Sequence, residues 1–161
     1  MAAVDYFLNI DGIPGESQDG KHEGEIEVLS WSWGETATTS GVGGGGGGGK
    51  VNIEDIHLTS NFSKASPQLL LACASGKHFK SAVLTARRSG AAQFEFLTVS
   101  LNDVLVSSYR TKDEEEDEYG PVDSFSLNFS QIRFDYREME PDGSAGETVK
   151  TGWDVKQNKQ I

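Results

Sequence analysis

The sequence contains little of what crosslinks, anchors or exports many proteins. Cys73 is the only cysteine, so no intrachain disulfide can form and a disulfide-stabilised secreted scaffold is excluded. No apolar run reaches the roughly 20 residues that a membrane helix needs. Residues 1–5 lack the basic and apolar regions of a signal peptide. We therefore expect a protein that folds in a cytosol, does not insert into membranes, and leaves the cell only by a route without a signal peptide.

Basic residues are also scarce. The 161 residues include 14 Lys and Arg against 25 Asp and Glu, which gives a formal net charge of −11. The acidic run from Asp113 to Glu118 contributes −6 of this charge. No basic patch interleaved with aromatic residues is present, so nucleic acid is not an expected partner. The length suits one hydrophobic core, and we expect residues 1–161 to form a single domain.

Motifs for catalysis or cofactor binding are missing or fail in detail. The spacing from Gly44 to Lys50 matches the outline of a phosphate-binding loop, but Val51 replaces the required Ser or Thr, and a strand is predicted to follow where that motif needs a helix. Cys73 falls on the apolar stripe of a predicted helix, which favours a small buried side chain over a nucleophile. The histidines lack metal-ligand spacing: His22, His57 and His78. We expect no enzyme, no bound metal and no cofactor.

Alternation of apolar and polar residues predicts about eight short strands. They cover residues 4–10, 25–33, 51–58, 79–87, 94–102, 104–109, 125–136 and, briefly, 153–155. The segment 104–109 either continues the preceding strand after a bend or stands alone. One helix is predicted, with Ser66 as N-cap, Pro67 at the first helical position and Gly76 at the left-handed exit. Its expected apolar stripe is Leu69, Leu70, Cys73 and Ala74. The sum is a mainly β barrel or sandwich with one lateral helix.

The strand over 25–33 is the most informative. Successive side chains of a strand point to opposite faces, so Trp31 and Trp33 share one face. The apolar side changes phase, from Ile26 and Val28 to Leu29 and the two tryptophans, as a β-bulge would produce. The polar face is then expected to hold Glu25, Glu27, Ser30 and Ser32.

Two loops differ from the rest in composition. Residues 41–50 form a glycine-rich loop, which we expect to be flexible because seven consecutive glycines carry high backbone entropy. Residues 111–121 form an acidic loop, which we expect to be solvated because its like charges repel.

Several separated blocks resemble the Hcp family, the haemolysin-coregulated tube proteins of the bacterial type VI secretion system. The blocks are residues 7–13, 15–17, 25–34, 64–78, 104–108, 127–130 and 152–154, together with His22 and Asn158. They run in the same order as in the family from about residue 4 to residue 158. The blocks at 25–34 and 64–78 are the most specific.

The resemblance implies a β-barrel subunit that forms homohexameric rings. Such rings stack into a tube that a contractile sheath expels together with a tip spike protein. The lumen carries and stabilises small effector proteins. The expected partners are therefore the protein itself, effectors, spike and sheath, and the expected location is the bacterial cytoplasm followed by secretion. Some members of the family carry a C-terminal toxin domain. We expect none in this chain, and therefore expect it to be non-enzymatic.

The same resemblance suggests two functional surfaces. Ser32 corresponds to a lumen position that touches cargo, and Ser30 and Glu27 share its polar strand face. The second surface is an extended loop near ring–ring contacts: Gly41, Val42, Gly43, Gly44, Gly45, Gly46, Gly47, Gly48, Gly49 and Lys50. Two alternatives stay open, a tail-tube protein of a phage-like contractile injection system and a stand-alone exported effector.

Overall fold

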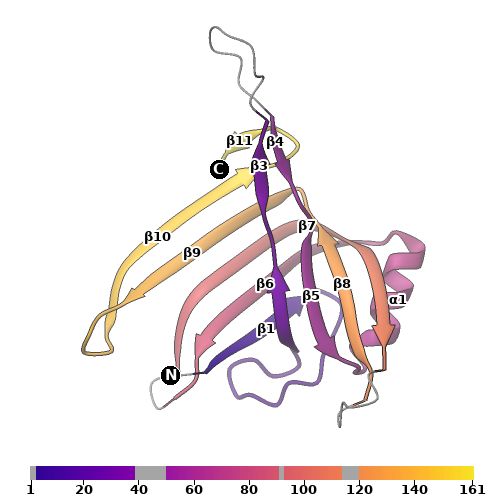
Figure 1. Cartoon of the computed structure of the whole chain (residues 1–161), viewed down its shortest axis with the longest axis horizontal. Coiled ribbons are helices and arrows are strands. Elements are labelled where there is room, and N and C mark those ends of the chain that lie inside the picture. Colours follow the sequence, from indigo (N-terminus) through magenta and orange to yellow (C-terminus); the bar gives the residue numbers. More distant parts are fainter. Residues whose placement is uncertain (1–2, 39–49, 91–92, 114–119) are drawn as a thin grey trace, which may run out of the picture.

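The computed structural model describes residues 3–38, 50–90, 93–113 and 120–161 (Figure 1). These residues form eleven strands and one helix. The strands are β1 (Val4–Ile10), β2 (Ile26–Ser32), β3 (Glu35–Ala37), β4 (Val51–Ile53), β5 (Ile56–Asn61), β6 (His78–Arg88), β7 (Phe94–Lys112), β8 (Val122–Asn128), β9 (Gln131–Met139), β10 (Ala145–Asp154) and β11 (Lys159–Gln160), and the helix is α1 (Ala65–Ser75). The mainly β class with one helix is confirmed.

Six of the strands close into an antiparallel barrel. Their order is β7-β6-β1-β2-β5-β8, and β8 pairs back onto β7. Closure satisfies the backbone groups that the edges of an open sheet would leave unpaired. The helix α1 packs against β7, and its Leu69 and Ala72 join the barrel core.

Strand β7 takes part in both the barrel and an outer sheet. Its first half pairs with β6 on one side and β9 on the other, whereas its second half pairs with β8. Asp103 separates the halves with a left-handed φ of 54°, a conformation that Asp tolerates better than most residues. The segment 104–109 is therefore a continuation after a bend, one of the two alternatives that the sequence left open.

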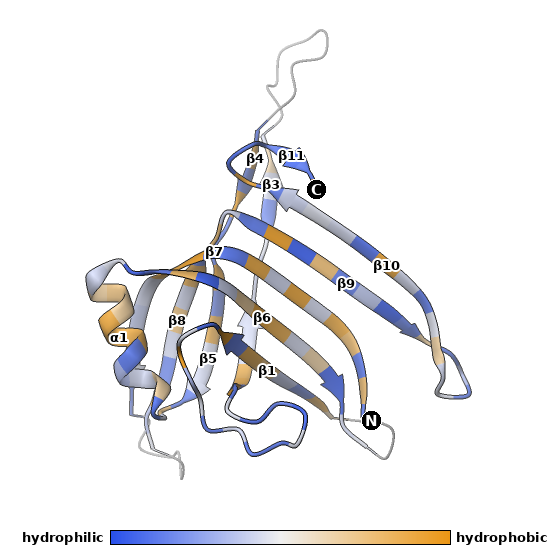
Figure 2. Ribbon diagram, turned by 180° about the vertical axis from the view of Figure 1, so that it is seen from behind, coloured by the Kyte–Doolittle hydropathy of each residue, from blue (hydrophilic) through white to orange (hydrophobic). Residues whose placement is uncertain are grey.

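Strands β9, β10 and β11 extend the sheet beyond β7 and form the outer sheet (Figure 1). Colouring by hydropathy shows apolar and polar residues alternating along β7 and β9, so each strand has one apolar and one polar face (Figure 2). The outer sheet brings the main sheet to nine strands. With the β3–β4 pair the described residues contain eleven strands, against about eight predicted from the sequence.

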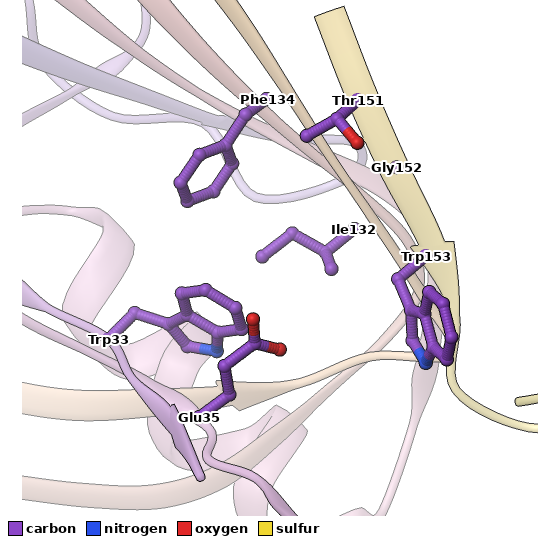
Figure 3. A pocket seen from close by; sticks show the side chains of 7 residues that line it. All are labelled: Trp33, Glu35, Ile132, Phe134, Thr151, Gly152 and Trp153. Atoms are coloured by element: carbon purple, nitrogen blue, oxygen red, sulfur yellow. The ribbon is translucent and has the colours of Figure 1, made fainter. Parts of the chain in front are cut away.

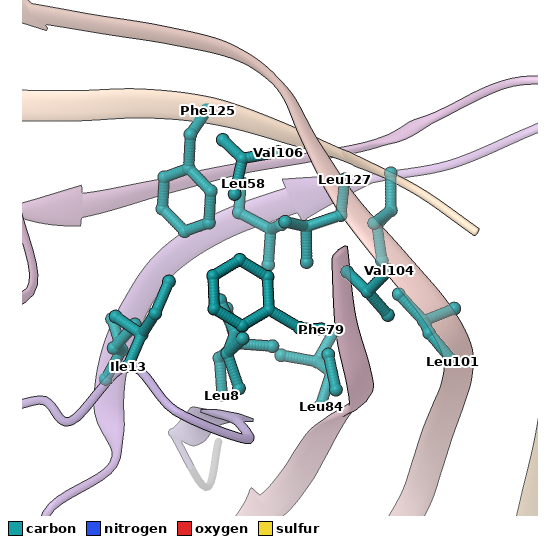
Figure 4. Close-up of a cluster of buried hydrophobic side chains, with 14 of the residues drawn as sticks. Leu8, Ile13, Leu58, Phe79, Leu84, Leu101, Val104, Val106, Phe125 and Leu127 are labelled. Atoms are coloured by element: carbon teal, nitrogen blue, oxygen red, sulfur yellow. The ribbon is translucent and has the colours of Figure 1, made fainter. Parts of the chain in front are cut away.

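The hydrophobic core fills the barrel interior. Side chains from several strands meet there, among them Leu8, Leu58, Phe79, Phe125 and Leu127 (Figure 4). Leu127 has no exposed surface and Leu8 only 1%. Burial on this scale stabilises by roughly 1.5–3 kcal/mol for each large apolar side chain.

The bulge expected in 25–33 is present, but it lies one position later than the sequence suggests. The register of β2 against β5 shifts between Val28 and Ser30. Leu29 is 53% exposed, so it points outward rather than joining the tryptophans. The prediction for Leu29 is wrong because hydrophobicity alone cannot tell which side of a bulge a residue joins.

Two predicted strands are each divided in the structure. Residues 51–58 give β4 and β5, and β4 leaves the barrel to pair with β3 in a separate hairpin. Residues 125–136 give β8 and β9, which pair with different halves of β7. In both segments the apolar alternation changes phase at the point where one strand ends and the next begins. Strand β10 is ten residues long, and the sequence revealed only its end, because most of its side chains are exposed.

The helix begins two residues earlier than predicted, at Ala65 instead of Pro67. Lys64 occupies the N-cap without a side-chain hydrogen bond, and Gly76 provides the expected left-handed exit at φ 66°. Ser66 lies inside the helix, where it is buried. The buried stripe is Ala65, Ser66, Leu69 and Ala72, with Cys73 half-buried, whereas Leu70 is 55% exposed. The predicted stripe is wrong at Leu70 and Ala74 because β7 contacts the neighbouring side of the helix.

Candidate functional site

A polar wall covers the outside of the barrel over β2, β5, β8 and the second half of β7. The pairing registers place its side chains in two rows. The first row is Ser32, His57, Ser126 and Ser108, and the second is Ser30, Thr59, Ser124 and Arg110. Outward residues of these strands alternate with the core residues on the inner face. We call these eight residues the polar wall.

Hydroxyl groups hold the polar wall together. Ser30 and Thr59 share a hydrogen bond of 2.6 Å between their side-chain oxygens. Ser126 contacts the hydroxyls of both Ser107 and Ser108, at 2.7 and 2.5 Å, because a register shift between Val106 and Ser108 turns both serines to this face.

A carboxylate fixes one edge of the same surface. Ser107 donates a hydrogen bond of 2.6 Å to Asp55, and Asn128 donates one of 2.9 Å to the other oxygen of that carboxylate. Hydroxyls thus dominate the surface, and Arg110 supplies positive charge at its end. Such a surface offers many weak hydrogen bonds and no deep apolar contact.

The residues proposed from the sequence are partly brought together. Ser30 and Ser32 are exposed neighbours in the polar wall, as expected from their alternation. Glu27 is exposed on the same face of β2 but lies opposite Phe7 of β1, beside a hollow that it shares with Asp19 and Arg87. The wall residues from β5, β7 and β8 were missed, because only the strand pairing shows that they continue the surface of β2.

The glycine-rich loop belongs to the β3–β4 hairpin. Gly41, Val42, Gly43, Gly44, Gly45, Gly46, Gly47, Gly48 and Gly49 lie outside the described residues, as do five residues of the acidic run, from Glu114 to Glu118. Lys50 is described and exposed, and its carbonyl accepts a hydrogen bond of 3.1 Å from the backbone N–H of Thr38. The hairpin itself was not predicted, and its strands β3 and β4 form a sheet separate from the barrel.

An apolar groove lies between the start of the hairpin and the outer sheet. Trp33, Ile132, Phe134 and Trp153 line it, and the carboxylate of Glu35 lies at its edge beside Trp33 (Figure 3). The Trp33 and Phe134 rings pack edge to face with centroids 5.6 Å apart. Trp33 also donates a hydrogen bond of 2.8 Å to the carbonyl of Glu54, which fixes the path of the chain into the hairpin.

The apolar face continues beyond the groove to exposed residues. In register, Leu97 of β7 lies beside Tyr136 of β9, which lies beside Val149 of β10. Tyr136 is 45% exposed and Val149 is 56% exposed. This apolar row therefore leaves large hydrophobic side chains in contact with solvent.

One polar cluster lies in the core beneath the helix. Asp123 is 1% exposed and accepts hydrogen bonds from Ser66 and, at 3.0 Å, from the Tyr109 hydroxyl. Burial raises the pKa of Tyr109, and the Asp123 carboxylate raises it further. The cluster is enclosed and fully engaged in internal hydrogen bonds, so it ties α1 to β7 and β8.

Chemistry of other kinds is not visible in the part of the chain that the structure describes. No group of three His, Cys, Asp or Glu residues is placed there to hold a metal ion. Among the same residues, no helix has the length and apolar character needed to cross a membrane. The fold and its surfaces define a β-barrel protein, with a polar wall on one side and an apolar outer sheet on another.

Comparisons with known proteins agree with this class. Residues 7–136 match the family described as "Type VI secretion system effector, Hcp". Protein hcp1 of Pseudomonas aeruginosa is 49% identical over 162 residues, which cover 98% of this chain and 99% of that protein. The structure resembles Hcp1 from Salmonella typhimurium with a TM-score of 0.82 at 34% identity, over 100% of both chains. It also resembles a type VI secretion system effector from Yersinia pestis, with a TM-score of 0.74 at 30% identity, over 94% of this chain and 100% of the other.

This chain belongs to the Hcp family of the type VI secretion system. The family is a structural, non-enzymatic family of tube proteins, so the resemblance stated from the sequence blocks is confirmed.

Proposed function

We propose that this tube protein forms a homohexameric ring whose polar wall lines the lumen, and that stacked rings carry small effectors out of the cell. This proposal is best supported by two different surfaces of the same chain, the hydroxyl-rich polar wall and the exposed apolar row. A hydroxyl-rich surface suits a wet channel, whereas an exposed apolar row needs a partner to cover it. The ring would be made in the cytoplasm and exported with the spike by contraction of the sheath.

The apolar row supports a neighbouring copy as its cover. Head-to-tail contacts between identical subunits give a ring when the rotation closes. A second barrel that covered Tyr136 and Val149 would remove their apolar area from water, which stabilises at about 25 cal/mol per Å². A glutamate in place of Val149 would bury a charge in that contact and should prevent ring formation.

The test of ring formation is the absolute mass of the purified protein, measured by light scattering after gel filtration, with negative-stain images of the same peak. We expect a hexamer with ring-shaped particles for the native chain and monomers for Val149→Glu. Thr148→Glu is the matched control, because the adjacent exposed residue points to the opposite face and should leave rings intact. A monomeric native chain, or intact rings in Val149→Glu, would contradict this interface.

Cargo binding is tested at Ser32. Ser32 is exposed on β2 beside His57 in the polar wall, so a larger side chain there would narrow the proposed channel and replace a hydroxyl. We expect Ser32→Gln to form normal rings but to lose protection of a co-expressed effector from proteolysis. Ser75→Gln, at the exposed end of α1, is the control. Full effector protection by Ser32→Gln rings would refute a cargo role for this surface.

We further propose that the loop from Gly41 to Lys50 contributes to stacking between rings. The proposal is supported by the hairpin whose strands this loop connects, because β3 and β4 pair with each other and not with the barrel. Deleting residues 43–49 should leave rings intact and impair tubes seen by electron microscopy. Unchanged tube formation would argue against the proposal.

A further inference from the structure

Residues 14–25 form a loop that folds over the outside of β1 and β6, and the tube function gives it no role. Its two ends pair with each other: the N–H of Gly15 donates to the carbonyl of Gly24 at 2.7 Å, and the N–H of Ser17 donates to that of Glu25 at 3.0 Å. Glu16 accepts a hydrogen bond of 3.1 Å from the backbone N–H of Lys64, the N-cap of α1. The loop therefore connects the barrel wall to the helix.

His22 is the residue by which the loop is fastened to β7. Its side chain is 8% exposed, and its ring stacks on Phe7 with centroids 4.4 Å apart and planes 8° from parallel. The Nδ1 atom lies 3.0 Å from a carboxylate oxygen of Glu25 within the loop. The Nε2 atom lies 2.7 Å from a carboxylate oxygen of Glu95 on β7.

This geometry specifies the charge of the ring. A neutral imidazole has one N–H donor and one acceptor nitrogen, whereas imidazolium has two donors. Both ring nitrogens of His22 face carboxylate oxygens, which only accept when ionised. A neutral His22 would satisfy one contact and place a lone pair against the other carboxylate.

Every element packed around His22 contributes a charged group. Arg87 of β6 lies 4.8 Å from the centroid of the Phe7 ring and pairs with Asp19 of the loop at 2.7 Å. It also lies 3.4 Å from Asp5 of β1. Four carboxylates therefore surround one guanidinium and one imidazole: Asp5, Asp19, Glu25 and Glu95. With a proton on His22, four negative and two positive groups leave the cluster at a net charge of −2, and loss of that proton would make it −3.

We propose that residues 14–25 form a pH-sensitive clamp, which is closed while His22 is protonated and loosens when His22 loses its proton. Loosening would detach the loop from Glu95 and uncover Phe7 and Arg87. It would also weaken the hydrogen bond between Glu16 and the N-cap of α1.

The sign of the pH dependence follows from the surroundings. Burial by itself lowers the pKa of His22, but the hydrogen bonds to Glu95 and Glu25 outweigh burial and raise the pKa above its ordinary value of 6.5. A raised pKa in the folded protein means that the clamp stabilises fully below that ordinary value. Its contribution is lost as pH rises through the raised pKa of His22.

The test follows the ring proton and the loop together in the full-length protein. Carbon-13 NMR of the histidine rings should show His22 titrating above the midpoint of the same residue in urea-unfolded protein. Hydrogen exchange of the loop amides, corrected for intrinsic rates, should show full protection at a lower pH, below the ordinary histidine pKa of 6.5, and protection that falls as pH rises above it. In His22→Gln at the lower pH, protection of the Ser17 and Gly24 amides should drop by about tenfold or more, the size expected for a hydrogen bond to a charged group.

Two controls keep the outcome decisive. His57→Gln replaces an exposed histidine of the polar wall and should leave loop protection unchanged at every pH. If His22→Gln does not fold, Glu95→Gln is the second variant, because Glu95 is 39% exposed and keeps a neutral acceptor at the same place. Glu95→Gln should lower the titration midpoint of His22. A His22 ring that is neutral at the lower pH, or loop protection independent of pH in the native chain, would overturn the proposal.

Discussion

The sharpest test of the structure concerns Gly15 in the loop over residues 14–25. A Cβ atom built on Gly15 lies 2.4 Å from the carbonyl oxygen of Glu25, 2.6 Å from its carbonyl carbon and 2.7 Å from the backbone nitrogen of Ile26. All three contacts are with backbone, so no side chain can rotate away to make room. Gly15→Ala therefore forces the two ends of the loop apart.

The size of the destabilisation follows from the hydrogen bonds that are lost when the two loop ends separate. The two hydrogen bonds that join the loop ends, from the N–H groups of Gly15 and Ser17, each contribute about 0.5–1.5 kcal/mol. Overpacking strain that remains after relaxation adds about 1–3 kcal/mol. Together these give an expected loss of about 2–6 kcal/mol in the free energy of unfolding for Gly15→Ala.

Gly20 provides a matched control in the same loop. It is exposed, and a Cβ built there meets no atom within 4 Å. Gly20→Ala should be neutral or stabilise by roughly 0.4–1 kcal/mol, because it reduces the freedom of the unfolded chain. Urea unfolding followed by tryptophan fluorescence gives both values, with unchanged m-values as a check on two-state behaviour. Equal midpoints for the two variants would refute the close approach at Gly15.

Three further predictions test the core, the cluster beneath the helix and one exposed carboxylate. Leu127→Ala, at a position with no exposed surface, should lower the free energy of unfolding by about 2–5 kcal/mol in urea denaturation, and a loss below 1 kcal/mol would contradict its place in the core. Ser66→Ala removes a donor to buried Asp123 and should destabilise by about 1–3 kcal/mol, whereas Ser75→Ala at the exposed helix end should not. Hydrogen bonds from Ser130, Lys156 and His78 lower the pKa of Asp103 below its ordinary value of 3.8, so its stabilising contribution is present above that value and lost as pH falls. Thermal unfolding of Asp103→Asn across acidic pH should vary less than that of the native chain, and identical profiles would contradict this role.

The class of the fold and most strand positions could be predicted from local patterns. Alternation located β1 and β6 almost to the residue, and the phase change in 25–33 revealed the bulge in β2. Gly76 marked the end of the helix because glycine adopts a left-handed exit without steric cost. Each of these signals depends only on a residue and its near neighbours in the chain, so it can be recognised from the sequence alone.

The alternation of apolar and polar residues did not predict those strands that lack one buried and one exposed face. Strand β10 has few buried side chains, so its sequence lacks a clear apolar period. Strands β4 and β5 run together in the sequence, but their partners lie in different sheets. The buried side of α1 was misplaced because β7 determines which side of the helix is covered.

The sequence by itself determined the family, the β class, the alternation that exposes Ser30 and Ser32, and the loop motif around Gly15 and His22. The tertiary structure alone decided that distant segments complete these features. Ser32 joins His57 and Ser126 only through the registers of three strands, and His22 meets Glu95 across 73 residues. The physical reason is that periodicity fixes which face a side chain takes, whereas pairing between strands far apart in the chain fixes what lies beside it.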